Sequence, residues 1–177
     1  MEESIGDYQF NPGVQNLLGH GEFAVVYKGH VKDNPEELVA VKAYNKNTCD
    51  FHLCIREIDI LNRLNHPNIV QLYYWEETVT HLYAVLEYCN AKDLAQYLKD
   101  KGQLDEESIK LFSKQMIRAL GVLIDKNVIH RDIKPDNILI DAMGHIKLTD
   151  FGLCTGFRWT HDTEFYQNKN GNKFFPY

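Results

Sequence analysis

The segment His130-Arg-Asp132-Ile-Lys134-Pro-Asp-Asn137 places a carboxylate, an ammonium and an amide within six residues. Such a set suits phosphoryl transfer, because the protein's part in that reaction is mainly positioning and charge stabilisation. Asp132 would accept the proton of an attacking hydroxyl, and Lys134 would neutralise charge on the transferred group. Asn137 would bind Mg²⁺. His130 is expected to pack as a buried imidazole and to act neither as a base nor as a metal ligand.

A second acidic group follows 13 residues after Asn137, in the tripeptide Asp150-Phe151-Gly152. A carboxylate beside a glycine can turn into a cleft and bind Mg²⁺, which prefers oxygen ligands, while the phenyl ring packs behind it. The tripeptide alone is weak evidence, but its position after the first segment favours function. Asn137 and Asp150 are therefore predicted to form a magnesium site.

Lys42 ends the apolar run Val39-Ala-Val-Lys, where a lysine is usually just solvated. Glu57 lies 15 residues later, on the face of an expected helix that also carries Leu61 and Leu64. An unpaired carboxylate on a core-facing side would be unfavourable. We therefore predict an ion pair between Lys42 and Glu57 that holds the ammonium toward the phosphates of a nucleotide.

A glycine-spaced motif, Gly19-His-Gly21-Glu-Phe-Ala24, precedes these residues. Such spacing fits either a dinucleotide-binding turn or a simple hairpin, and the former needs a helix directly after the glycines. Here the β-rich run 24–28 follows, which argues against a dinucleotide oxidoreductase. We expect a hairpin whose backbone covers phosphates, because glycines permit close approach.

The elements that must position these residues form a strand-rich first part and a helix-led second part. Strands are expected at 14–18, 24–28, 38–44, 70–75 and 81–87, and a helix at 51–64. Asp93 and Asp105 are expected to cap two further helices, the second over 106–124. Short apolar segments follow at 128–129, 138–140 and 145–148. This order predicts an α+β fold of two lobes with a ligand-binding cleft between them.

Composition excludes several other classes of protein. The 177 residues carry 19 Lys+Arg against 25 Asp+Glu, a net charge of -6 that does not support nucleic-acid binding. No apolar run is long enough to span a bilayer, and the acidic N-terminus does not look like a secretory signal. The four cysteines fit no zinc motif and are expected to be reduced thiols, typical of a cytoplasmic or nuclear protein.

These motifs together resemble the eukaryotic protein kinases, over nearly the whole chain. The resemblance implies a protein kinase domain, 1–177, incomplete at its end, with an N-lobe over 8–87, a hinge over 88–92 and a partial C-lobe over 93–177. It implies ATP and Mg²⁺ as ligands, and a protein substrate with Ser or Thr hydroxyls, because Lys134 is typical of the serine/threonine branch.

The resemblance also assigns the adenine pocket. Leu86 would be the gatekeeper, and Glu87 with Cys89 would offer backbone groups to adenine. The other residues expected at ATP are Leu18, Gly19, Gly21, Val26, Ala40, Lys42, Glu57 and Leu139. A hydrophobic spine linking the lobes would consist of Leu61, Leu72, His130 and Phe151.

Two kinase groups share the resemblance. The first half, with LLGHGEFAVVYKG and LEYCNAKDLAQYL, is similar to the ULK (autophagy-initiating) kinases, and GHIKLTDFGLCTGFRWTHDTEFYQ is similar to the LATS/NDR kinases. No Ala-Pro-Glu element follows, so the chain is expected to end within or just after the activation segment. Apolar surface on the helix 106–124 would then be exposed and would favour association with a regulatory partner.

Three hypotheses follow for the function. The first is an ATP- and Mg²⁺-dependent Ser/Thr kinase. The second is a catalytically incompetent kinase fragment that binds nucleotide or a protein partner. A purely structural domain is the third, and it leaves the ordered polar residues unexplained.

Overall fold

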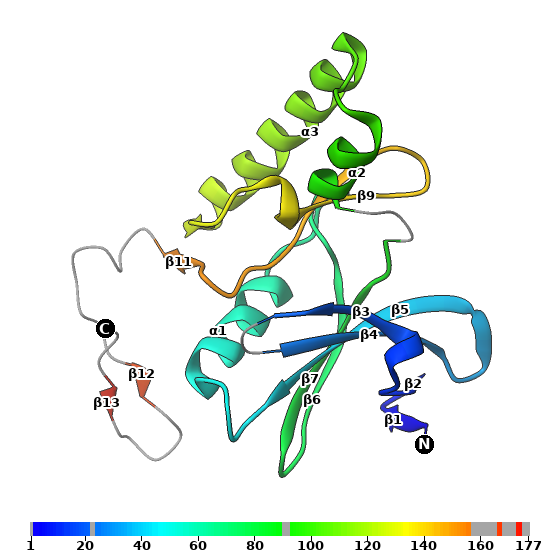
Figure 1. Cartoon of the computed structure of the whole chain (residues 1–177). Helices are drawn as coiled ribbons and strands as arrows, with labels where there is room; N and C mark the ends of the chain where they lie inside the picture. Colours follow the sequence, from blue (N-terminus) through cyan, green and yellow to red (C-terminus); the bar gives the residue numbers. More distant parts are fainter. Residues whose placement is uncertain (1, 22–23, 90–92, 157–165, 168–172, 175–177) are drawn as a thin grey trace.

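The computed structural model describes residues 2–21, 24–89 and 93–156, together with the backbone of 166–167 and 173–174. A twisted antiparallel sheet forms one lobe and two helices lead the other, with one helix lying against the sheet (Figure 1). This arrangement is the α+β, two-lobed fold expected from the sequence. The predicted hinge, 88–92, is described only as far as Cys89, and most of the chain after Gly156 lies outside the described residues.

Seven strands build the large sheet in the order β1-β2-β4-β5-β7-β6, with β3 paired to β4. Their bounds are β1 Glu3–Ile5, β2 Tyr8–Phe10, β3 Leu17–His20, β4 Ala24–Val31, β5 Asn34–Asn45, β6 Leu72–Glu77 and β7 His81–Glu87. The hairpin β1–β2 extends the sheet to residues before position 8, where the sequence places the start of the N-lobe.

Strand β5 separates two clusters of buried side chains because its residues alternate between the faces of the sheet. Val39, Val41 and Ala43 pack with Ile5 and Phe10 of the β1–β2 hairpin on the outer face. Ala40 and Tyr44 belong to the larger cluster on the inner face, which also includes residues of α1 and of the second lobe. The sheet is therefore covered on both faces.

Helix α1 (Phe51–Asn62) begins at Asp50, whose carboxylate accepts hydrogen bonds from the backbone N–H groups of His52 and Leu53. Such capping satisfies donors that have no partner within the helix. The predicted face of this helix is confirmed, because Glu57, Leu61 and the following Leu64 are all at most 3% exposed.

The second lobe contains α2 (Leu94–Lys101), α3 (Glu106–Asp125) and short strands. Asp93 and Asp105 cap α2 and α3 by accepting from Gln96 N and Ser108 N, as predicted. The remaining elements are β8 Val128–Ile129, η2 Pro135–Asn137, β9 Ile138–Ile140, β10 Ile146–Leu148, β11 Thr155–Gly156, β12 Tyr166–Gln167 and β13 Lys173–Phe174. They form three small antiparallel pairs, β9–β10, β8–β11 and β12–β13.

Apolar side chains are exposed along α3, as the sequence predicts for this helix. Ile109 is 50% exposed, Ile117 68% and Ile124 61%. Ile109 and Ile117 line an apolar pocket of about 400 Å³ together with Leu94, Phe112 and Met116. This face of the helix is therefore only partly covered by the described residues.

Two predicted strands are placed differently in the structure. Residues 14–16 form a 3-10 turn, η1 (Val14–Asn16), because Asn16 N donates to Gly13 O at 3.0 Å and the Asn16 side chain donates to Asn11 O. Val14 is 87% exposed, so its apolar character does not report a strand. The strand expected at 70–75 begins two residues later, because Val70 N donates to Leu148 O in the other lobe.

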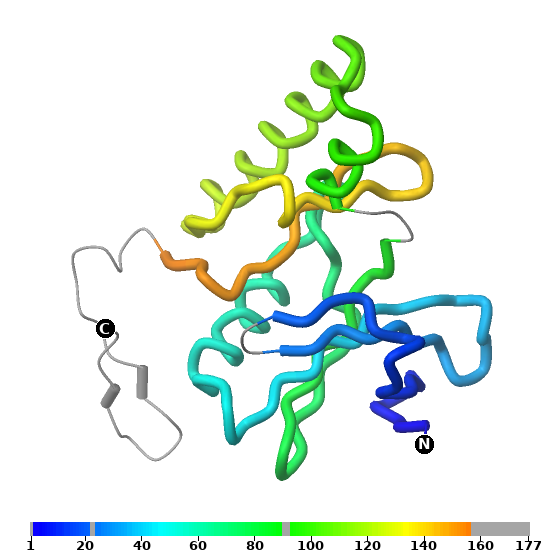
Figure 2. The backbone as a smooth tube through the Cα atoms, in the orientation of Figure 1, coloured from blue at the N-terminus to red at the C-terminus, as the bar shows by residue number. Residues whose placement is uncertain are grey.

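The loop between α1 and β6 accordingly reaches across to the second lobe before the chain returns to the sheet (Figure 2). Leu148 N donates to Asn68 O at 2.9 Å, and the Asn68 side chain donates to Ile146 O at 2.8 Å. These bonds fasten β10 to the loop that follows α1.

Gly29 in β4 is a position where an added side chain would meet backbone of a neighbouring strand. An added Cβ would lie 2.7 Å from Gln9 O and 3.1 Å from Val41 Cγ2. We expect Gly29→Ala to lower the free energy of unfolding by roughly 1–3 kcal/mol, because β2 must move away. The measurement is urea denaturation of the two proteins.

Gly121→Ala is the matched control for this substitution. Gly121 lies within α3, and its added Cβ would meet nothing within 4 Å. It should raise stability by about 0.5–1 kcal/mol, since alanine favours helix interiors. Equal stability of Gly29→Ala and the unmodified chain would contradict the close approach of β2 to β4.

Candidate active site

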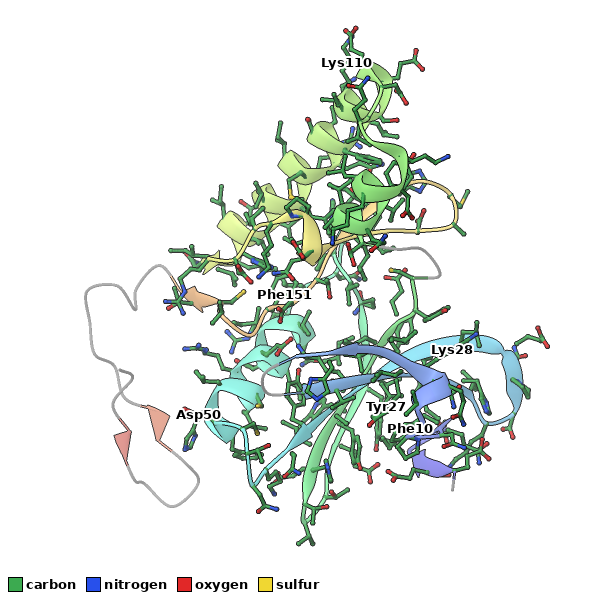
Figure 3. The ribbon with its side chains drawn as sticks, in the orientation of Figure 1. Phe10, Tyr27, Lys28, Asp50, Lys110 and Phe151 are labelled. Carbon is green, nitrogen blue, oxygen red and sulfur yellow. The ribbon has the colours of Figure 1, made fainter. Side chains whose placement is uncertain are left out.

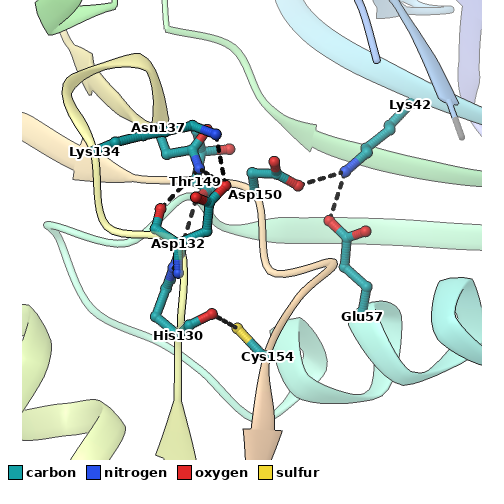
Figure 4. A network of polar contacts seen from close by, with 9 residues as sticks. All are labelled: Lys42, Glu57, His130, Asp132, Lys134, Asn137, Thr149, Asp150 and Cys154. Atoms are coloured by element: carbon teal, nitrogen blue, oxygen red, sulfur yellow. Dashed lines mark hydrogen bonds and ion pairs between the residues drawn. The ribbon is translucent and has the colours of Figure 1, made fainter. Parts of the chain in front are cut away.

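Lys42 is the centre of an ion-pair cluster between the two lobes. Its Nζ lies 2.7 Å from Glu57 Oε1 on α1 and 3.4 Å from Asp150 Oδ1 (Figure 4). The predicted Lys42–Glu57 pair is therefore confirmed. The side chains of Lys42 and Glu57 are 15% and 4% exposed, whereas that of Asp150 is 48% exposed. One carboxylate thus anchors the lysine, and the other lies open to a ligand.

The charge state of Lys42 follows from this surrounding. Burial acts to lower the pKa of the ammonium, but the charges of Glu57 and Asp150 and their hydrogen bonds outweigh it and raise the pKa. The side chain is consequently a permanent cation at neutral pH. It is suited to hold anionic phosphate oxygens beside Asp150.

The loop after β8 gathers the other predicted catalytic groups. Asp132 Oδ2 accepts a hydrogen bond from Asn137 Nδ2 at 2.8 Å and pairs with Lys134 Nζ at 2.8 Å. The hydrogen bond from Lys134 and that from Asn137 hold the pKa of Asp132 below its usual range, although its burial opposes this. Asp132 is therefore an ionised carboxylate whose orientation is fixed by two neighbours.

Two residues in this region have left-handed backbone conformations that only glycine adopts freely. Arg131 has φ 69° and Asp150 has φ 61°. Strained conformations of this kind persist where the surrounding contacts over-determine them, often at functional sites. Here Arg131 Nε donates to Leu153 O at 2.6 Å. The turn at Asp150 directs its carboxylate toward Lys42, while Phe151 is fully buried.

His130 is a packing residue, in agreement with the sequence. It is 2% exposed, and its ring lies edge-on to Phe151 with the centroids 4.9 Å apart. Nε2 lies 3.0 Å from Thr149 O, and Nδ1 accepts from Asp132 N. Burial lowers its pKa, which favours the neutral imidazole. The ring links the loop after β8 to the segment before Asp150. Phe151 lies between the lobes (Figure 3), and it is buried in the inner cluster together with Leu61, another residue expected in the spine.

The glycine motif lies in a strand-to-strand hairpin, as predicted. Gly19 pairs with Val26 across β3 and β4, and Gly21 N donates to Ala24 O at 2.9 Å. A Cβ at Gly19 would meet nothing within 4 Å, so the hairpin leaves free volume at this position. Residues 22–23, between the two strands, lie outside the described residues.

The residues expected around adenine gather on the inner face of the sheet. Ala40 and Leu86 are neighbours across β5 and β7 and belong to the inner cluster. Val26, Leu139 and Cys89 pack against the same cluster. These residues come from both lobes. Leu139 belongs to the second lobe, where it lies on β9 and pairs with Asp93.

Leu18 and Glu87, also expected at ATP, do not belong to this apolar cluster. Leu18 on β3 is 45% exposed. Glu87, at the end of β7, directs its carboxylate to Lys147 Nζ at 2.7 Å. Lys147 is absent from the sequence-based site, although a lysine between Ile146 and Leu148 in a short apolar strand is a signal that could have found it.

The fold and the site together define the class of two-lobed protein-kinase folds. Similarity to known proteins agrees: the family described as "Protein kinase domain" matches residues 13–175. The chain belongs to the protein kinase family.

Its relatives include both groups that the sequence resembles. It is 40% identical over 163 residues to the human serine/threonine-protein kinase ULK1, covering 86% of this chain and 15% of that protein. It is 40% identical to unc-51 of Caenorhabditis elegans, covering 87% of this chain and 19% of the relative. It is 47% identical over 116 residues to Warts of Drosophila melanogaster, covering 66% and 10% respectively. The chain thus spans less than a fifth of each relative.

Protein kinases use ATP and usually Mg²⁺, and the site can be tested for its fit to the ion. Asp150 and Asn137 carry carboxylate and amide oxygens, the hard ligands that Mg²⁺ prefers. The ion is commonly held by one or two protein groups together with substrate phosphates. Asp150 is half-exposed next to Lys42, so the side chains present fit this arrangement.

Among the residues that the structure describes, no helix combines the length and the apolar character needed to cross a membrane.

Proposed function

We propose that the chain is an ATP-dependent serine/threonine protein kinase, which transfers the γ-phosphoryl group of Mg·ATP to Ser or Thr hydroxyls of proteins. The observation that carries this proposal is Lys42 Nζ at 2.7 Å from Glu57 and 3.4 Å from Asp150. This contact supports the proposal because the cation that would bind phosphate lies beside a half-exposed carboxylate from the other lobe. Phosphoryl transfer by a kinase requires both the Lys–Glu ion pair and the aspartate that binds Mg²⁺.

Each polar group has a role that its contacts support. Lys42 binds the α- and β-phosphates, and the Gly19–Gly21 hairpin covers them with backbone N–H groups. Asp150 and Asn137 would hold Mg²⁺, which would neutralise the charge that develops on the phosphate oxygens. Asp132 accepts the proton of the substrate hydroxyl, and Lys134, 2.8 Å from it, stabilises the charge on the phosphoryl group.

The same proposal assigns the nucleoside. The adenine ring would lie among the apolar side chains that both lobes contribute, with Leu86 at the back and the backbone of Glu87 and Cys89 at the edge. Leu18 would cover the ring from β3, where its exposed side chain is available to a ligand. The preference for Ser and Thr rests on Lys134 and on the relatives, which are serine/threonine-protein kinases.

The test is transfer of labelled phosphate from ATP to three peptide pools in which Ser, Thr or Tyr is the only hydroxyl residue. We expect Mg²⁺-dependent labelling of the Ser and Thr pools and none of the Tyr pool. EDTA should abolish the labelling. Binding of Mg·ATP in a thermal-shift measurement, with no transfer to any pool, would overturn the kinase assignment and favour a catalytically incompetent nucleotide-binding domain.

A further inference from the structure

Lys147 is a buried cation in the middle of the short strand β10. The residue is 9% exposed and lies between Ile146 and Leu148, which are 1% and 0% exposed. Its Nζ pairs with Glu87 Oε1 at 2.7 Å and donates to Pro67 O at 2.9 Å. The ammonium thus joins the end of β7 to the loop after α1.

Glu87 is held by more than this ion pair. Its Oε2 accepts from Gln71 N at 3.3 Å, and its own backbone N donates to Gln71 O at 2.8 Å. The residue is the last of β7, after which the chain leaves the sheet for the second lobe. Three contacts therefore fix the backbone and the side chain at the point where the lobes connect.

The burial of the pair makes it sensitive to the loss of either partner. The side chains of Lys147 and Glu87 are 11% and 22% exposed. Removing one member of a buried pair leaves an uncompensated charge, which is far more unfavourable than breaking a solvated pair. The exposed pair Lys110–Glu106 on α3, at 64% and 80% exposure, provides the contrast.

Both members of the ion pair lie close in sequence to residues of the proposed nucleotide site. Leu86, directly before Glu87, belongs to the apolar cluster expected to receive adenine. Lys147 lies three residues before Asp150, and the neighbouring Leu148 N donates to Asn68 O. A shift of Glu87 would displace Leu86, whereas β10 is also held by Asn68, which bonds to Ile146 O and Leu148 N independently of Lys147.

We propose that Lys147 is a positioning residue for the adenine subsite: by holding the Glu87 carboxylate, it fixes the backbone that contacts the base. This role rests on the proposed function, since it presumes that adenine binds at the end of β7. Lys147 itself does not touch the nucleotide. Its loss therefore acts on recognition of the base and leaves the phosphate contacts of Lys42 unchanged.

The experiment measures binding of adenosine and of Mg·ADP by calorimetry to the whole chain carrying Lys147→Met, Glu87→Gln or both. Each single change should weaken both ligands by the same factor, roughly tenfold, because only the shared base is affected. The double variant should lose less than the product of the single losses, since no unpaired charge remains. Lys110→Met, at the far end of α3 (Figure 3), is the matched control and should bind normally.

Kinetics separate positioning from a merely structural role. The KM for ATP should rise in parallel with the dissociation constants, while kcat stays within about twofold. Lys147→Arg, which keeps the charge, should recover part of the affinity. If Lys147→Met fails to fold, Glu87→Gln still breaks the ion pair and can be measured instead, because glutamine has nearly the same volume as glutamate.

The outcomes distinguish the two proposals. No binding of either ligand by the unmodified chain would overturn the proposed function, and the positioning role with it. Normal binding by the unmodified chain and by both single variants would overturn the positioning role alone. Faster turnover at unchanged affinity would also overturn it, because the pair would then restrain the lobes.

Discussion

Asp150→Asn is expected to abolish magnesium-dependent phosphoryl transfer, with a loss on the order of 10³-fold or more. Asparagine keeps the size of the side chain and one oxygen, but it removes the negative charge that attracts Mg²⁺ and pairs with Lys42 at 3.4 Å. Kinase catalysis depends on positioning and electrostatic stabilisation, so no other group compensates. Turnover with saturating peptide, measured across a range of Mg²⁺ concentrations, tests this expectation.

Asp59→Asn is a suitable control for this substitution. Asp59 is also paired with a cation, Arg63, and its side chain is 49% exposed, against 48% for Asp150. Asp59 lies on α1 outside the proposed site. The activity of Asp59→Asn should therefore stay within about twofold of that of the unmodified chain, because surface substitutions usually change stability little. Because the 2.7 Å contact between Lys42 and Glu57 remains, Asp150→Asn should stay folded. Full activity of Asp150→Asn would refute the assignment of the metal site.

Asp132→Asn should lower kcat by about 10²–10⁴-fold while leaving the affinity for adenosine unchanged. The amide cannot accept the proton of the attacking hydroxyl, and it meets Lys134 and Asn137, both 2.8 Å from the present carboxylate. The nucleotide contacts assigned to Lys42 and the apolar cluster are not involved. Single-turnover kinetics and calorimetry separate the two effects, and equal losses in binding and turnover would contradict this role.

The pH profile provides an independent check on Asp132. A general base must be deprotonated, and Lys134 holds the pKa of this carboxyl below its usual range. The activity of the unmodified chain should therefore remain level from neutral pH downward and fall only below about pH 4, the ordinary range for aspartate. Loss of activity near pH 6 would assign the base to another group.

The sequence predicts the polar site well because its members lie close together along the chain or at fixed helical spacing. Asp132, Lys134 and Asn137 lie within one loop, and Glu57 shares a helix face with Leu61. The Lys42–Glu57 pair could be predicted across 15 residues because an unpaired carboxylate on a buried face is unfavourable.

The features that the sequence did not predict depend on contacts between distant segments. Nothing near Lys147 indicates that Glu87, 60 positions earlier, lies opposite it in the fold. The hairpin β1–β2 consists of two strands of only three residues each, too short to show a clear alternation. The turn at Val14 is set by hydrogen bonds to Gly13 and Asn11, which oppose the strand preference of an apolar residue.

The two faces of strand β5 can accept different amino-acid substitutions. Lys42 and its inner neighbours face the proposed nucleotide site, while Val39 and Val41 face the β1–β2 hairpin. Alternate residues of β5 therefore serve different purposes. Those on the inner face form the proposed site, and those on the outer face pack against the hairpin. Paired substitutions in the outer face of β5 and in the β1–β2 hairpin therefore change the stability of the sheet or its outer surface. They leave the residues of the proposed nucleotide site unchanged.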